Sequence, residues 1–200
     1  VIAAAKKAEI YDDIMAMPAM LKFVVQIVAA LIPTLNGVIV RAVSNPNIFS
    51  DNPYWVLDWL TVPVTVLWIV GVINSVNLID GLDGLANGVS AISATTVLVI
   101  ALIASEARVA LVMAALVGAS VGFMPYNQNP AKMFMGDTGA TFLGFILASM
   151  SIQGLFKFYT VISFVVPFLI LGLPIFDTAF AFIRRIAHGQ SPMHADRSHI

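Results

Sequence analysis

The feature that most constrains the fold is a series of apolar stretches, each long enough to cross a bilayer as a helix. A transmembrane helix needs about 20 predominantly apolar residues. The chain has six such stretches, at about 19–40, 60–78, 85–104, 107–125, 138–156 and 159–182. Because these stretches are continuous and do not alternate in polarity, they indicate helices. We predict an all-α, polytopic transmembrane helix bundle that forms a single membrane domain over residues 1–200.

Composition excludes several other classes of protein. Of the 200 residues, 60% are hydrophobic and 10% are charged, whereas an ordinary soluble domain has roughly 25% charged residues. Disorder requires the opposite balance of low hydrophobicity and high charge. The chain has no cysteine, which excludes disulfides, thiolate metal sites and a cysteine nucleophile. With a net charge of -1, we expect membrane lipid and no nucleic acid among its partners.

The distribution of basic residues predicts the orientation of the spans. If all six stretches cross the membrane, both chain ends and the loops near 79–84 and 126–137 share one side. That side has seven basic residues and the other side three: Lys6, Lys7, Lys22, Lys132, Arg184, Arg185 and Arg197 against Arg41, Arg108 and Lys157. Cytoplasmic segments carry the excess of Lys and Arg, so we expect the first side to be the cytoplasmic face of the plasma membrane. Most of the acidic residues fall on that same side.

Two acidic motifs stand at the junctions of apolar stretches on this side. The first contains Asn77, Asp80 and Asp83 in the segment 77–84, where two glycines permit a tight turn. One interpretation is that Asp80 or Asp83 caps the next helix, and the other is a polar pocket for a ligand or metal. The second motif places Asp137 at the start of the fifth stretch, where it either caps the helix or holds Mg²⁺ near a bound phosphate.

Three further polar segments lie on the same predicted face. Asp12 and Asp13 precede the first stretch, and adjacent carboxylates are most easily explained beside a cation. The tail carries groups able to meet phosphate, or simply anionic lipid: His194, Arg197 and His199. In the loop after the fourth stretch, Asn127 is suited to bind a base or sugar and Phe134 to stack on a ring, although a simple proline-terminated loop is the alternative. Together these groups favour phosphoryl chemistry at a membrane surface.

The same segments resemble a known family. Segments 77–86 and 134–139 resemble the two hallmark motifs of the polyprenyl-phosphate N-acetylhexosamine-1-phosphate transferases, the MraY, WecA and TagO family. Segment 127–132 resembles the loop before the second hallmark, and Asp12-Asp13 stands where the family has an aspartate pair. Segment 194–200 resembles the start of the histidine-rich loop of the WecA/TagO branch. Because family members have ten or eleven spans, the resemblance implies that this chain is a fragment.

The resemblance implies a reaction and a set of residue roles. A sugar 1-phosphate, most simply N-acetylglucosamine 1-phosphate, would move from a UDP-sugar to undecaprenyl or another polyprenyl phosphate, with release of UMP. The catalytic residues would be Asp12, Asp13, Asp80 and Asp83. Asp137 and Asp12 would hold Mg²⁺, or Mn²⁺ in its place. Substrate would be bound by Asn77, Asn127, Lys132, Phe134, His194, Arg197 and His199. The resemblance also allows a homodimer.

Two other functions are compatible with a membrane protein of this composition. A CDP-alcohol phosphatidyltransferase also uses membrane Asp-Gly motifs, but it requires further acids along the next helix, and none lies between Asp83 and Glu106. An ion-coupled transporter places its acids near the bilayer midplane on broken helices, whereas here they cluster at one predicted face. We therefore keep the transferase as the prediction and these two as alternatives.

Overall fold

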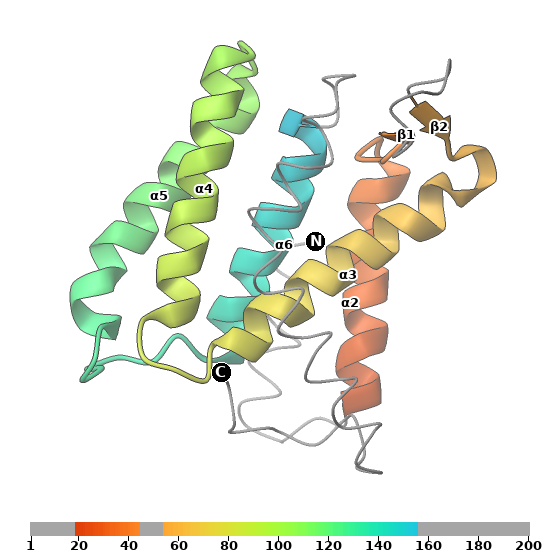
Figure 1. Cartoon of the computed structure of the whole chain (residues 1–200). Helices are drawn as coiled ribbons and strands as arrows, with labels where there is room; N and C mark the ends of the chain where they lie inside the picture. Colours follow the sequence, from red (N-terminus) through yellow and green to blue (C-terminus); the bar gives the residue numbers. More distant parts are fainter. Residues whose placement is uncertain (1–18, 45–53, 156–200) are drawn as a thin grey trace.

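The computed structural model describes residues 19–44 and 54–155, and the chain there is mostly helical (Figure 1). Five α-helices follow one another along these residues, with a short 3-10 helix and a two-stranded antiparallel sheet between the first two. The elements are α2 (Ala19–Leu35), β1 (Ala42–Ser44), β2 (Tyr54–Val56), η1 (Asp58–Leu60), α3 (Thr61–Ile79), α4 (Leu85–Ile103), α5 (Ala107–Asn127) and α6 (Gly136–Leu155).

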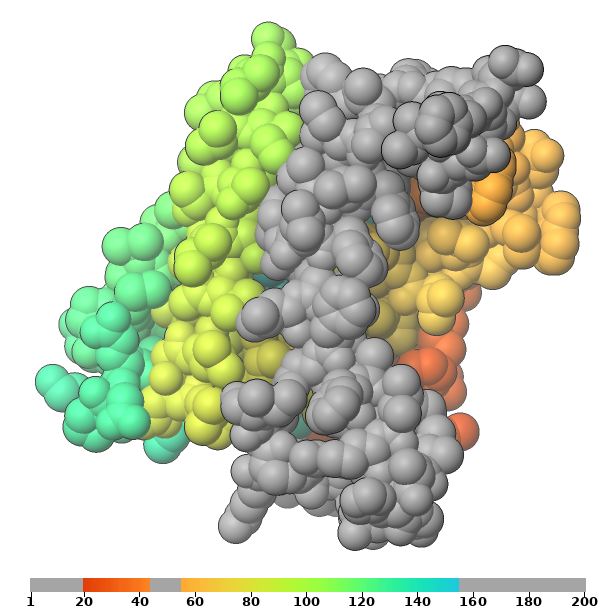
Figure 2. Space-filling view, in the orientation of Figure 1, coloured from red at the N-terminus to blue at the C-terminus, as the bar shows by residue number. Residues whose placement is uncertain are grey.

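Helix α6 lies in the centre of the described bundle. It packs against α3, α4 and α5, while α2 packs on α3 and the antiparallel α4 and α5 form the most extensive helix pair. In Figure 1 the α4–α5 pair stands on the left and the α2–α3 pair on the right, with α6 between them. Figure 2 shows α4 and α5 again at the left edge of the surface. Large apolar side chains such as Ile103 and Leu111 are exposed there, as is expected of helices that face lipid.

The helices confirm the predicted membrane bundle in part. Three segments are long and apolar enough to span a membrane, namely Asp58–Ile79, Leu85–Ile103 and Ala107–Asn127, and Met20–Leu35 is a shorter apolar helix. The fifth predicted stretch corresponds to α6, which is not among those three within the described residues. The sixth predicted stretch, 159–182, lies outside the described residues.

The segment after α2 differs from the prediction. The first stretch was expected to continue to about residue 40, but α2 ends at Leu35 and Gly37 has φ +93°. That left-handed conformation favours glycine and ends helices. Val38 and Val40 stay buried in an extended segment, and the Val40 N–H donates to the Thr65 hydroxyl at 2.9 Å. At α2 the apolar run therefore continues beyond the end of the helix.

A β-hairpin occupies part of the segment that the sequence analysis left between the first two helices. Strands β1 and β2 pair antiparallel, with Val43 opposite Trp55. β-Branched and aromatic residues of this kind are common in strands. The hairpin lies at the end of the bundle opposite the loops that follow α3 and α5 (Figure 1).

The contact between α3 and α6 depends on a small residue. A Cβ at Gly144 would lie 2.7 Å from the Cα of Ile73 and 3.2 Å from the carbonyl oxygen of Val72. No side chain fits at that distance, so glycine allows the two helix backbones to approach each other. This contact brings the N-terminus of α6, with Asp137, to the C-terminus of α3, with Asp80.

Candidate functional site

The described acidic motifs lie at one end of the bundle. The first turn of α2, the α3–α4 turn, the α5–α6 loop and the start of α6 all lie at the bottom of Figure 1. They carry five charged residues, namely Lys22, Asp80, Asp83, Lys132 and Asp137. The opposite end has Arg41, Asp58, Glu106 and Arg108. The prediction that acids separated in sequence return to one face is thus confirmed for the described residues.

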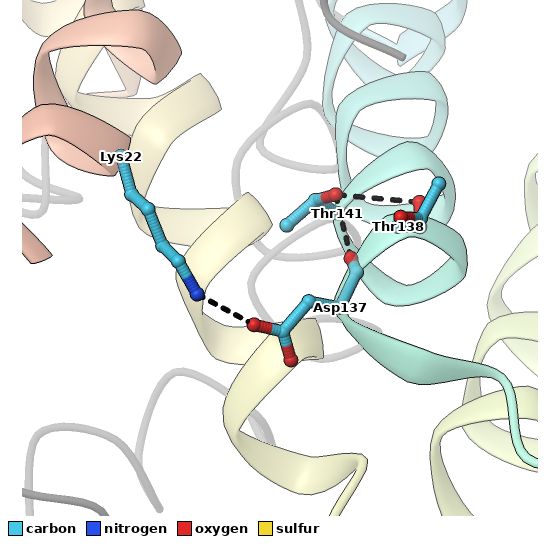
Figure 3. A network of polar contacts seen from close by, with 4 residues as sticks. All are labelled: Lys22, Asp137, Thr138 and Thr141. Atoms are coloured by element: carbon cyan, nitrogen blue, oxygen red, sulfur yellow. Dashed lines mark hydrogen bonds and ion pairs between the residues drawn. The ribbon is translucent and has the colours of Figure 1, made fainter. Parts of the chain in front are cut away.

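Asp137 forms an ion pair with a lysine from another helix. The Lys22 ammonium, in the first turn of α2, lies 2.8 Å from the Asp137 Oδ2, and the two side chains are 35% and 47% exposed (Figure 3). Asp137 belongs to the first turn of α6, where the helix dipole favours a carboxylate. The backbone oxygen of Asp137 accepts the Thr141 hydroxyl at 2.7 Å. The Asp137 carboxylate thus lies beside the Lys22 ammonium, while its backbone oxygen is bonded within α6.

Asp80 is the second carboxylate of this group. It follows the last residue of α3, so it lies just outside the span. The pKa of Asp80 is raised from 3.8 to about 6, chiefly by partial burial and secondly by the charge of Asp137, while a backbone hydrogen bond with Gly136 acts in the opposite direction. An aspartate whose ionisation is opposed by a neighbouring carboxylate is suited to bind a cation.

Asp83 lies in the same turn but has a different neighbour. Its Oδ2 accepts the backbone N–H of Ala131, in the α5–α6 loop, at 3.0 Å. Helix α4 begins after Gly84, which has a left-handed φ of +76°. Gly84 occupies the N-cap position, and no side chain caps the helix there. The interpretation of Asp80 or Asp83 as the cap of the next helix is therefore wrong, because Asp80 ends α3 and Asp83 bonds another loop.

The α5–α6 loop presents two of the predicted substrate residues. Lys132 and Phe134 are both exposed, and the Phe134 side chain is 77% exposed. Asn127, at the end of α5, is 3% exposed, and its Nδ2 donates to the Met133 carbonyl at 3.0 Å. Among the described residues, Asn127 thus acts within its own loop and is not turned toward solvent.

Asn77 lies in the last turn of α3, one turn before Asp80. Its Oδ1 is buried, as is that of Asn127, and neither oxygen has a hydrogen-bond partner in the described part of the chain. Buried polar atoms are nearly always satisfied by protein or water. These two oxygens are therefore acceptors that remain available for a donor on a ligand or water molecule.

The described carboxylates suit a divalent cation only together with further ligands. No group of three or more His, Asp or Glu side chains able to hold a metal is present in residues 19–44 and 54–155. Asp80 and Asp137 are nevertheless an acidic pair, and Mg²⁺ is often bound by one or two carboxylates together with substrate phosphates. Other predicted site residues lie outside the described part: Asp12, Asp13, His194, Arg197 and His199.

The contact of Lys22 with Asp137 is not predicted from the sequence, where Lys22 counts only as a positive charge that helps to orient the spans. The signal was its position, because a lysine within an apolar stretch is costly unless its ammonium is paired or reaches the membrane surface. That signal gave no partner, since 115 residues separate Lys22 from Asp137.

The fold and the site define a helical membrane protein with a group of carboxylates and a paired lysine at one end of the bundle. A comparison with known families identifies the family of this protein. The family model described as glycosyl transferase family 4 matches residues 3–155. The chain therefore belongs to this family, as the resemblance of its two hallmark motifs predicted, and not to the phosphatidyltransferases.

Several curated proteins are similar to the chain. A Bacillus subtilis protein described as a probable undecaprenyl-phosphate N-acetylglucosaminyl 1-phosphate transferase is 43% identical over 191 residues, which are 96% of this chain and 52% of that protein. A decaprenyl-phosphate N-acetylglucosaminephosphotransferase of Mycolicibacterium smegmatis is 33% identical over 46% of this chain and 25% of its own length.

A phospho-N-acetylmuramoyl-pentapeptide-transferase of Beutenbergia cavernae is 44% identical over 43% of this chain and 24% of its own length. The chain thus spans at most about half the length of these three curated relatives.

Proposed function

We propose that the protein of which this chain is part transfers N-acetylglucosamine 1-phosphate, or a related N-acetylhexosamine 1-phosphate, from a UDP-sugar to polyprenyl phosphate. An oxygen of the lipid phosphate attacks the phosphorus that bears the sugar. A new diphosphate bond forms, the bond to the bridging oxygen breaks, and UMP leaves. The observation that carries this proposal is the Asp80–Asp137 pair with Lys22, within a chain of glycosyl transferase family 4.

The acidic pair supports a role in holding the nucleotide diphosphate through Mg²⁺, with Mn²⁺ as a substitute. The Asp80 and Asp137 carboxylates, together with Asp12 or Asp13, are the groups we assign to the metal. A bound Mg²⁺ would neutralise the charge that develops on the leaving phosphate. The fit rests on the Asp137 charge beside Asp80, which opposes ionisation of Asp80 and which a bound divalent cation would offset.

Lys22 places a positive charge beside the Asp80–Asp137 pair. Its ammonium already lies 2.8 Å from the Asp137 carboxylate, so it would lie beside any phosphate held there. An ammonium placed next to a transferring phosphoryl group stabilises charge in the transition state. We assign Lys22 to the diphosphate, while the exposed Lys132 and Phe134 side chains on the neighbouring loop would contact the nucleotide.

The remaining assignments follow from the family motifs. Asp12 or Asp13 would deprotonate the lipid phosphate, and the tail residues His194, Arg197 and His199 would bind phosphate or sugar. Asn77 and Asn127 would offer their buried oxygens to the uridine. We place the site on the cytoplasmic face of the plasma membrane, with the lipid tail along the apolar helix faces. The enzyme, as a homodimer, would begin the synthesis of a cell-envelope glycan.

The test uses the full-length protein purified in detergent. It is mixed with UDP-N-acetylglucosamine and undecaprenyl phosphate, and UMP is measured with and without Mg²⁺. We expect UMP only when the lipid phosphate and Mg²⁺ are both present. Asp137→Asn should abolish turnover, while Asp58→Asn, at the opposite end of the bundle, should turn over normally.

Two results would contradict the proposal. The first is near-normal turnover by Asp137→Asn, which would remove that carboxylate from the site. The second is no UMP from a folded protein that has also been offered other UDP-N-acetylhexosamines. Transport driven by a sodium or proton gradient would then become the hypothesis to test.

A further inference from the structure

We infer that Asp83 is a positioning residue that holds the nucleotide-contacting loop, and that its carboxylate does not take part in the chemical step. The inference rests on the proposed function and deepens it, because it assigns a different task to one of the two aspartates of the 77–84 motif. The juxtaposition that carries it is the Asp83 carboxylate against the backbone of the α5–α6 loop.

The two aspartates of the α3–α4 turn have different surroundings. Asp80 interacts with Asp137 at the start of α6. Asp83 instead accepts the Ala131 N–H at 3.0 Å, a contact between residues 48 positions apart in sequence. A carboxylate that accepts a backbone N–H makes a charge-assisted hydrogen bond, which is stronger than a neutral one. The motif therefore divides into one carboxylate that faces α6 and one that holds a loop.

The backbone beside Asp83 also approaches this loop closely. A Cβ at Gly84 would lie 3.4 Å from the Asn127 carbonyl oxygen and 3.4 Å from the Gln128 Cα. A side chain at residue 84 would thus contact the beginning of the loop, so the turn lies close to it. The hydrogen bond from Ala131 to Asp83 adds a second point of attachment, three residues further along the loop.

Three other hydrogen bonds of the loop lie within its own segment. The Tyr126 carbonyl accepts the backbone N–H groups of Lys132 and Met133 at 2.8 and 2.9 Å, and Asn127 Nδ2 donates to the Met133 carbonyl at 3.0 Å. These bonds fix the shape of the loop but not its position on the bundle. The bond to Asp83 joins the loop to the α3–α4 turn, and so places Lys132 and Phe134 relative to Asp80.

The experiment compares Asp83→Ala with Asp83→Asn in the full-length protein. The asparagine keeps an oxygen that can accept the Ala131 N–H, whereas the alanine does not. We expect Asp83→Ala to raise the KM for UDP-N-acetylglucosamine by roughly three- to tenfold, the effect of losing one such bond. The kcat and the KM for undecaprenyl phosphate should change by less than about twofold, and Asp83→Asn should restore the KM for the UDP-sugar.

A second measurement does not depend on activity. Hydrogen–deuterium exchange of the peptide that covers residues 128–135 reports the attachment of the loop. We expect faster exchange in Asp83→Ala and wild-type exchange in both Asp83→Asn and the distant control Asp58→Asn.

Two outcomes would overturn the inference. One is a large loss of kcat in Asp83→Asn, which would return the carboxylate to the chemistry. The other is unchanged exchange in Asp83→Ala. If the wild-type protein releases no UMP, the proposed function fails, but the exchange measurement still tests the loop attachment.

Discussion

Replacement of Gly144 by alanine should separate α6 from α3. The new Cβ would lie 2.7 Å from the Ile73 Cα and 3.2 Å from the Val72 carbonyl oxygen. Carbon atoms in contact prefer about 3.5–4.0 Å, so the helices must move apart by roughly 1 Å. Both opposing atoms belong to the backbone and have no rotamer that would relieve the contact. Because Asp137 lies two turns earlier on α6, this movement also displaces its carboxylate from Asp80.

The magnitude follows from two opposing effects. Overpacking of a close-packed interior typically costs about 1–3 kcal/mol, and a backbone contact belongs in the upper part of that range. The helix propensity of alanine offsets about 1 kcal/mol of this. The expected net loss is therefore about 1–2 kcal/mol. Gly71, in α3, has open space at its Cβ, so Gly71→Ala receives the propensity gain without the clash and serves as the matched control.

The assay is thermal unfolding of the full-length protein in detergent, followed by measurement of UMP release. We expect Gly144→Ala to unfold a few °C below Gly71→Ala. In a protein of this size, each kcal/mol of stability moves the Tm by about 2–4 °C, and in a larger protein by less. We also expect UMP release to fall in Gly144→Ala alone. A Tm for Gly144→Ala equal to or above that of the control would refute the close-approach argument.

Two other predictions concern the charged group. Lys22→Met should lower the kcat at least tenfold, because it removes the ammonium beside Asp137, yet change the Tm little, since a half-exposed ion pair contributes at most about 1 kcal/mol; an unchanged kcat would remove Lys22 from the site. In EDTA, the pKa of Asp80 is about 6 in the folded protein, against the ordinary value of 3.8. As pH rises through this window, Asp80 therefore ionises in the unfolded chain before it ionises in the folded protein. Stability from this group should therefore be lost as pH rises through that window. Tm measured from pH 4 to 7 should fall more steeply in wild type than in Asp80→Asn, and parallel curves would contradict the pKa shift.

The sequence was sufficient to predict that the chain is a bundle of membrane helices. It also predicted which polar segments share one end. Residues such as Asp80, Asp83 and Asp137 stand at the junctions of apolar stretches, and a chain that crosses the membrane after each stretch must return to the same face. The boundaries of α3 and α4 differ from the predicted stretches by one residue at most. Their apolar runs and helices end together, since polar and glycine residues follow directly.

The sequence was less informative where a local signal competed with hydrophobicity. The end of α2 was predicted too late because the apolar residues after Gly37 are buried in an extended segment and not in the helix. The hairpin of β1 and β2 was not predicted, because each strand has three residues and a pattern that short has no measurable periodicity. Tertiary burial, and not helix propensity, accounts for Val38 and Val40, whereas Trp55 and Val56 of the hairpin are exposed.

The sequence by itself determined the acidic motif residues of the candidate site but not the part of Lys22, and only the tertiary structure decided which of these groups meet. The motif residues were recognisable because their chemistry is unusual in an apolar chain. Their partners were not, since Lys22 and Asp137 are 115 positions apart and Asp83 and Ala131 are 48 apart. Such contacts depend on how closely helices approach, and Gly144 shows that a single missing Cβ sets that distance. As a result of helix packing, Asp80 lies beside the charge of Asp137, whereas Asp83 accepts a hydrogen bond from a loop, although the two aspartates belong to the same motif.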